Sequence, residues 1–252
     1  MEALVLTVLS CVLPCENPGY ARSENFVVQG PSPEFAQEVL KHAETYRREL
    51  SLAWFGEELL AGEGPAIIHV QLSDQKDEAM TWPMAARGRE HHMVWITSNS
   101  ELALGSTLAH EITHVVLITR FGDDFPHWAN EGIAGICDDA PTKQIRARLL
   151  RKFAAERSWP RLRDVLDAES ISPADQNAYT VSVSLTRFLL SRGTQAEFIA
   201  FVTHGAKSGW DAAVRDAYGF QRVEQMEIAW QTWAAANPDA ELELVMLPTD
   251  GD

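Results

Sequence analysis

Residues 110–114 read His-Glu-Ile-Thr-His, a combination of residue types and spacing that can support metal chemistry. On a helix, positions i and i+4 lie on one face, so the imidazoles of His110 and His114 can bind the same metal ion. Glu111 follows the first histidine and is close enough to activate a water on the metal without being a ligand itself. The pattern therefore predicts a hydrolytic metal site with Glu111 as the general base.

A second interpretation of this pattern is a pair of core histidines beside a surface glutamate. The surrounding segment, residues 100–120, is otherwise largely apolar and has the spacing of a helix. Burying several polar side chains on such a helix without partners is costly, because each loses its bonds to water. A metal ion removes this cost, so we favour the metal site over the structural interpretation.

The third ligand decides the class of a catalytic zinc site, which takes three protein ligands and one water. A metzincin has Gly and His three and six residues after its second histidine, but these positions hold Leu117 and Arg120. Glu131 lies on the next predicted helix, and a helical hairpin can bring it back to the first helix. We therefore predict Glu131 as the third ligand. The alternative is an acid in the first turn of a helix, favoured there by the helix dipole.

Together, His-Glu-Ile-Thr-His and the downstream string Trp-Ala-Asn-Glu-Gly-Ile-Ala (residues 128–134) resemble the gluzincin metallopeptidases. In particular, the two strings are similar to those of the peptidase MA-like families, distant relatives of the thermolysin-like and aminopeptidase groups. The resemblance implies one Zn²⁺ per chain, bound by His110, His114 and Glu131, with Glu111 as general base. It also implies that the strand ending at Thr97 is an edge strand that pairs with an extended peptide substrate.

The resemblance also implies a residue that stabilises the negatively charged oxygen formed during hydrolysis. Tyr179 is the candidate, and the alternative is a core tyrosine with a satisfied hydroxyl. His127 is a second candidate for this role, or a surface residue. Thermolysin-like enzymes have a supporting aspartate one turn after the glutamate ligand, where this sequence has Gly135. Asp138 and Asp139 come later in the sequence and are the candidate substitutes.

The order of predicted elements indicates an α+β fold, with a small N-terminal mixed sheet followed by a mainly helical part. The resemblance to gluzincins implies that this part is a zincin-like domain. Alternating or β-branched segments predict the strands, and apolar spacing with helix start and stop signals predicts the helices. The strands are expected at residues 26–28, 66–71 and 92–97. The helices are expected at residues 33–50, 100–120, 126–137, 142–157, 174–191, 195–204, 210–218 and 223–235.

We assign residues 25–236 to one zincin-like domain, in which the sheet and the active-site helices reach to about residue 140. Residues 1–24 are a leader or an unstructured segment. Their apolar run, residues 3–13, is too short to span a bilayer, so no transmembrane segment is expected. The apolar run suits a signal peptide, but the absence of a basic residue before Arg22 argues against one. A signal peptide, a lipoprotein-like site at Cys11, a buried strand and a mis-assigned start of the chain are left as alternatives, as are cytoplasmic and exported locations. Residues 237–252 form an acidic tail.

The chain is strongly acidic, with 36 Asp and Glu against 21 Lys and Arg and a net charge of −15. Such a field repels phosphate backbones and anionic lipid, which argues against a nucleic-acid partner. The sequence favours a zinc-dependent peptidase that acts on a peptide or protein substrate. The alternative is a catalytically inactive zinc-binding or helical interaction domain, and the oligomeric state is left open.

Overall fold

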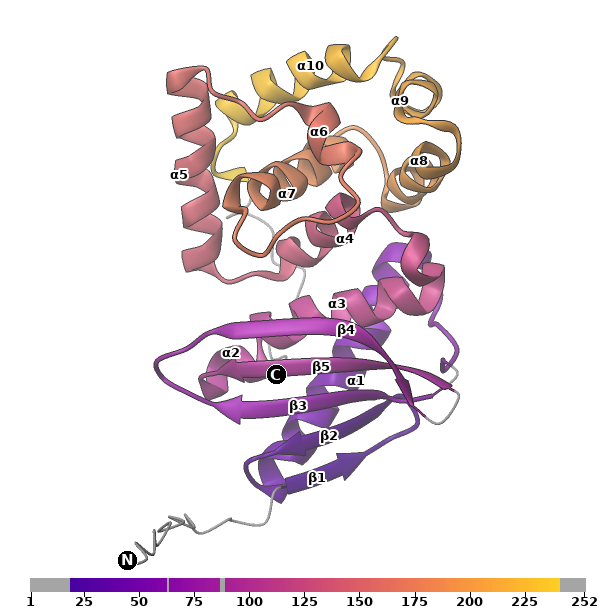
Figure 1. Cartoon of the computed structure of the whole chain (residues 1–252), viewed down its shortest axis with the longest axis vertical. Helices are drawn as coiled ribbons and strands as arrows, with labels where there is room; N and C mark the ends of the chain where they lie inside the picture. Colours follow the sequence, from indigo (N-terminus) through magenta and orange to yellow (C-terminus); the bar gives the residue numbers. More distant parts are fainter. Residues whose placement is uncertain (1–18, 63, 87–88, 241–252) are drawn as a thin grey trace, which may run out of the picture.

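The computed structural model describes residues 19–62, 64–86 and 89–240, and it consists of a mixed sheet followed by a helical region (Figure 1). The predicted α+β class is confirmed. The N-terminal run, Cys11 and Cys15 lie outside the described residues, as does the acidic tail beyond residue 240. The buried apolar residues of the described part form one cluster that extends from the sheet to the last helix.

The sheet has five strands in the order β1-β2-β3-β5-β4. β2, β3 and β5 are parallel, whereas β1 and β4 pair antiparallel at the two edges. Within the described residues the sheet starts at residue 19, so its first strand precedes residue 25, where the domain was expected to begin. The strands are β1 (Gly19–Arg22), β2 (Phe26–Gly30), β3 (Ala66–Leu72), β4 (Glu78–Ala86) and β5 (Arg89–Ser98).

The edge strand differs from the one predicted. The strand ending near Thr97 is β5, which pairs with β3 on one side and β4 on the other. β4 occupies the edge instead. Its sequence reads as a polar connection because it contains Pro83, but a proline is tolerated in an edge strand. Thr81 lies opposite the buried Val94 and therefore shares the inner face of the sheet.

Three helices cover the inner face of the sheet: α1 (Pro33–Phe55), α2 (Ser100–Leu104) and α3 (Ser106–Phe121) (Figure 1). α1 begins where the Ser32 hydroxyl accepts a hydrogen bond from the Phe35 N–H. The helix expected over residues 100–120 is in fact two, because the chain turns at Gly105, whose N–H bonds back to the Leu102 carbonyl.

One described segment, Ser100–Phe121, is long and apolar enough to cross a membrane by length and composition. Of the most apolar stretch of this segment, 56% is buried inside the protein. Core helices pass the same test, so the segment carries little weight for a membrane-spanning role.

The region after α3 is helical, as predicted, and only α6 was not expected from the sequence. Short 3₁₀ segments at Gly122–Asp124 and Gly135–Cys137 flank α4. Trp128 is fully buried and packs against the rings of Phe198 and Trp210, which fixes α4 to the helices behind it. The helices are α4 (His127–Ala134), α5 (Ala140–Glu156), α6 (Leu162–Leu166), α7 (Gln176–Leu190), α8 (Gln195–Ser208), α9 (Trp210–Tyr218) and α10 (Val223–Ala236).

α4 and α7 pack so closely that a glycine is required between them. A Cβ at Gly132 would clash with the Thr186 hydroxyl and lie 2.8 Å from the carbonyl oxygen of Ser182. Backbone cannot yield in the way that the end of a flexible side chain can. The glycine that follows Glu131 therefore allows α7, which carries Tyr179, to approach the helix that carries the predicted third ligand.

Candidate metal centre

α3 presents His110, Glu111 and His114 together. The ligand atoms of these three side chains lie within 4.8 Å of one another. The two imidazole rings meet edge to face, with centroids 4.9 Å apart. The helix itself is held by apolar residues on its other positions, among them Leu108 and Ile112, which are fully buried. The histidines are thus fixed by a helix that cannot easily rotate or slide.

α4 brings Glu131 to the same place. Its Oε2 atom lies 3.7 Å from Nε2 of His110 and 3.8 Å from Nε2 of His114. The structure therefore brings together all three of the side chains predicted as ligands. The alternative interpretation of Glu131 is wrong, because Glu131 lies beyond the first turn of α4 and that turn contains no acid.

Each histidine is oriented by a different acceptor. His110 Nδ1 lies 2.7 Å from Asp138 Oδ1, and His114 Nδ1 lies 2.8 Å from the amide oxygen of Asn130. Because neither acceptor oxygen can donate, the Nδ1 atoms carry the protons, and Nε2 is the nitrogen that would be left to bind a metal ion. Both Nε2 atoms point toward Glu131, so the orientation required of two metal ligands is built into the protein.

Asp138, which contacts His110, is itself held in place by Arg146. Its second oxygen, Oδ2, accepts a 2.5 Å bond from Arg146 Nη1, and Arg146 Nη2 donates to the Gly135 carbonyl at 2.9 Å. The position of Gly135 itself leaves no room for a side chain, because a Cβ there would clash with Val183. The supporting carboxylate therefore comes from three residues further on, after the 3₁₀ turn.

The charges of the cluster favour a cation at its centre. Burial opposes protonation of His110, but the carboxylates of Asp138, Glu131 and Glu111 outweigh it and raise its pKa well above the usual value. Burial also opposes ionisation of Asp138, but the charges of His110 and Arg146 lower its pKa to about 2. The pKa of Glu131 is likewise lowered, against its burial, by the neighbouring histidines.

One atom of the cluster lacks a hydrogen-bond partner. Glu131 Oε2 is buried and unbonded, although it faces the Nε2 atoms of both His110 and His114. A buried carboxylate oxygen without a partner is costly, and such atoms call for an explanation. Ligands of a tetrahedral zinc are about 3.3 Å apart, slightly less than the separations found here. A metal ion between the three side chains fits both the spacing and the unpaired oxygen.

A cavity of about 320 Å³ opens beside the cluster. Tyr179 and His127, the two candidates for stabilising a developing negative charge, both line it. His127 Nδ1 lies 3.9 Å from Glu131 Oε1. Burial, together with the charges of Glu131 and Glu111, raises the pKa of Tyr179, so its hydroxyl keeps its proton. Tyr179 lines this cavity and also packs against the buried core, so its position is compatible with both interpretations.

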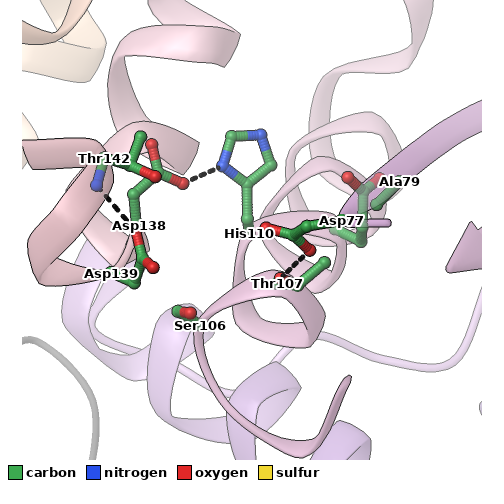
Figure 2. A pocket seen from close by; sticks show the side chains of 9 residues that line it. Asp77, Ala79, Ser106, Thr107, His110, Asp138, Asp139 and Thr142 are labelled. Carbon is green, nitrogen blue, oxygen red and sulfur yellow. Dashed lines mark hydrogen bonds and ion pairs between the residues drawn. The ribbon is translucent and has the colours of Figure 1, made fainter. Parts of the chain in front are cut away.

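A second, smaller cavity of about 150 Å³ shares His110 and Glu111 with the first (Figure 2). Three aspartates line it, and all three accept hydrogen bonds. Asp77 accepts from the Thr107 hydroxyl at 3.2 Å, and Asp139 caps α5 by accepting from the Thr142 N–H at 2.8 Å. The third, Asp138, supports His110. These carboxylates therefore hold the surrounding elements in place through hydrogen bonds.

Several contributors to the site were not predicted from the sequence. Asn130 and Arg146 carry no motif signal, and their roles follow only from the contacts that folding creates. Thr81 was not singled out either, yet its hydroxyl bonds to Glu111 at 2.6 Å. Cys137 is a small buried residue: its Sγ lies 3.7 Å from the Thr113 hydroxyl, and burial raises the pKa of its thiol.

Comparisons of the chain with protein-family models, with curated proteins and with solved structures found no match. The function is therefore argued from the geometry of the cluster, its unpaired oxygen and the adjoining cavity.

Proposed function

We propose that the protein is a zinc-dependent hydrolase, and specifically a peptidase that acts on a peptide or protein substrate. The observation that carries this proposal is the buried, unpaired Oε2 of Glu131 facing two oriented Nε2 atoms, on His110 and His114. Two histidines and one glutamate are a ligand set of hydrolytic zinc sites. One zinc ion per chain would satisfy the three side chains together.

The chain's own residues supply the rest of the reaction. Zinc, when bound, supplies a Lewis acid that lowers the pKa of a water molecule and polarises a carbonyl group. Glu111 lies within the cluster and can accept a proton from the attacking water, then deliver it to the leaving amine. Asp138 and Asn130 keep the two ligand imidazoles in the tautomer and orientation that this chemistry requires.

The cavity supports a role in catalysis rather than in structure alone. Tyr179 keeps its proton and can donate a hydrogen bond to the oxygen on which negative charge develops, and His127 can assist from α4. The edge strand β4 contributes Met80 and Thr81 to the same cavity, where an extended peptide can pair with it. Structural zinc sites are closed by a fourth protein ligand. The open cavity therefore favours the hydrolase over the inactive zinc-binding alternative.

Metal content tests the proposal directly. We expect about one zinc per wild-type chain by plasma mass spectrometry, on protein purified without a histidine tag. Glu131→Ala should lose most of it. Glu34→Ala is the matched control: it removes an exposed glutamate from the first turn of α1 and should keep the metal. Wild-type protein without metal, even after dialysis against zinc, would refute the proposal.

A further inference from the structure

The hydrogen bond between β4 and α3 at the candidate site has no counterpart in the pattern that predicted the site. Thr81 Oγ1 donates to Glu111 Oε2 at 2.6 Å. A carboxylate accepts such a bond strongly because it is charged. We propose that Thr81 is a positioning residue for the general base: it holds one oxygen of Glu111 and so aims the other. This inference rests on the proposed function, because it assigns Thr81 a role in the same reaction.

The position of the Thr81 hydroxyl is fixed by the sheet. β4 pairs with β5 in a continuous antiparallel register, from Glu78 opposite Thr97 to Ala86 opposite Arg89. Thr81 lies near the middle of β4, and its β-branched side chain has few rotamers. The hydroxyl is therefore presented by a rigid element. Glu111 has a longer side chain with three rotatable bonds, so it is the partner that the contact restrains.

The bond also joins the proposed general base to β4, the edge strand at which we propose that substrate pairs. Thr81 and Met80 line the cavity of about 320 Å³, together with Glu111. A peptide that pairs with the free edge of β4 would sit on the strand that holds the base. Thr81 thus sets the distance between the bound peptide and the Glu111 carboxylate, although it acts only through Glu111.

Two substitutions separate this role from a contribution to folding. Thr81→Val removes the hydroxyl but keeps the shape and the β propensity, whereas Thr81→Ser keeps the hydroxyl. Thr97→Val is the matched control, because it removes a strand hydroxyl that contacts Trp95 instead of Glu111. All three variants should keep the zinc content of the wild type.

The first readout is the crystal structure of each zinc-loaded variant, which requires no substrate. We expect Glu111 to leave its wild-type position in Thr81→Val and to keep it in Thr81→Ser and Thr97→Val. A Glu111 carboxylate that stays in place in Thr81→Val would overturn the inference. This result is independent of the proposed function, which the metal content and activity of the wild type decide.

The second readout is hydrolysis of fluorescein-labelled casein. Loss of a hydrogen bond to a charged group corresponds to at least about a tenfold effect. We expect kcat to fall about tenfold in Thr81→Val with KM unchanged, and to recover in Thr81→Ser. A rise in KM with kcat unchanged would instead assign Thr81 to substrate binding and contradict a positioning role.

Discussion

The part of the chain up to α3 and the helical region after it contribute to the candidate site in different ways. α3 supplies His110, Glu111 and His114 from two adjacent turns of one helix, so the helical repeat alone brings them together. The later region supplies Glu131 and Tyr179 from two helices that must first pack on α3 and on each other. The comparison teaches that the spacing of residues along one helix is enough to bring the first three side chains together. The side chains that complete and enclose the candidate site are positioned only when the later helices pack on α3.

The largest effect is expected for a substitution on α3. Glu111→Gln removes the base but leaves both histidines and Glu131 in place, so zinc content should stay at the wild-type level. Turnover of labelled casein should fall about 10³-fold, because general-base catalysis is lost. Plasma mass spectrometry and the casein assay on the same sample measure both. Full activity in this variant would show that the local group is not the base.

The packing of the later helices is tested by Gly132→Ala, which inserts a methyl group between α4 and the backbone of α7. Overpacking of this kind costs up to about 3 kcal/mol, roughly a 150-fold change in the unfolding equilibrium. The free energy of unfolding from urea denaturation should fall by that amount. Gly62→Ala is the control, since a Cβ there meets nothing closer than 3.8 Å. Equal stability of the two variants would mean that the α4–α7 contact yields easily.

A third test asks whether the helical region takes part in the reaction or only encloses it. Tyr179→Phe removes one hydroxyl from the cavity wall, and loss of one such donor lowers kcat about 10²-fold. Zinc content and KM should change little. Tyr20→Phe, at an exposed position on β1, should leave kcat unaltered. If both variants behave alike, Tyr179 belongs to the packing and His127 becomes the candidate donor.

The smallest effect concerns the contact that links the two parts, between His110 on α3 and Asp138 before α5. Asp138→Asn should weaken zinc binding roughly 10- to 100-fold near neutral pH, measured by competition with a chromophoric chelator. Asp139→Asn is the control: it removes the same charge one residue away, and asparagine also caps a helix well. Equal losses of zinc affinity in the two variants would mean that the lost negative charge, and not the contact with His110, causes the effect.

The same pair of variants has a predicted pH dependence. In the metal-free protein, the charge of Asp138 helps to raise the pKa of His110, against the effect of burial. Protons therefore begin to compete with zinc for His110 as the pH falls through that raised value. Asp138→Asn lowers the pKa, so its affinity should start to decline at a lower pH than that of the wild type. Identical onsets in the chelator titration would contradict this assignment.

The elements that the sequence predicted well are those with a repeating apolar face or a strong end signal. α1 begins at Pro33 and α9 covers Trp210–Tyr218, as the spacing indicates. β1 and α6 were missed because four or five residues are too short to show a period. β4 was missed because Pro83 interrupts its alternation, and the order of strands that makes it an edge is set by pairing between distant segments.

The residues of the candidate site likewise fall into those that spacing predicts and those that only tertiary contacts reveal. His110 and His114 follow from a spacing of four, and Glu131 from a second short string. Asp138 was one of two candidate acids, whereas Asn130 and Arg146 could not be chosen from the sequence. Asn130 acts through a hydrogen bond to His114 on another helix, and Arg146 acts through one to Asp138. Such contacts depend on the angle between packed helices, which side-chain spacing along a single helix does not encode.

The unpaired oxygen of Glu131 has a consequence for the life of the protein in a cell. A buried carboxylate oxygen without a partner lowers the stability of the metal-free chain, and an ion that satisfies it stabilises the native state by mass action. If that ion is zinc, as proposed, chains made when zinc is scarce should open more often and be degraded sooner. The abundance of the protein would then follow the zinc supply, so that the cell removes the copies that cannot work.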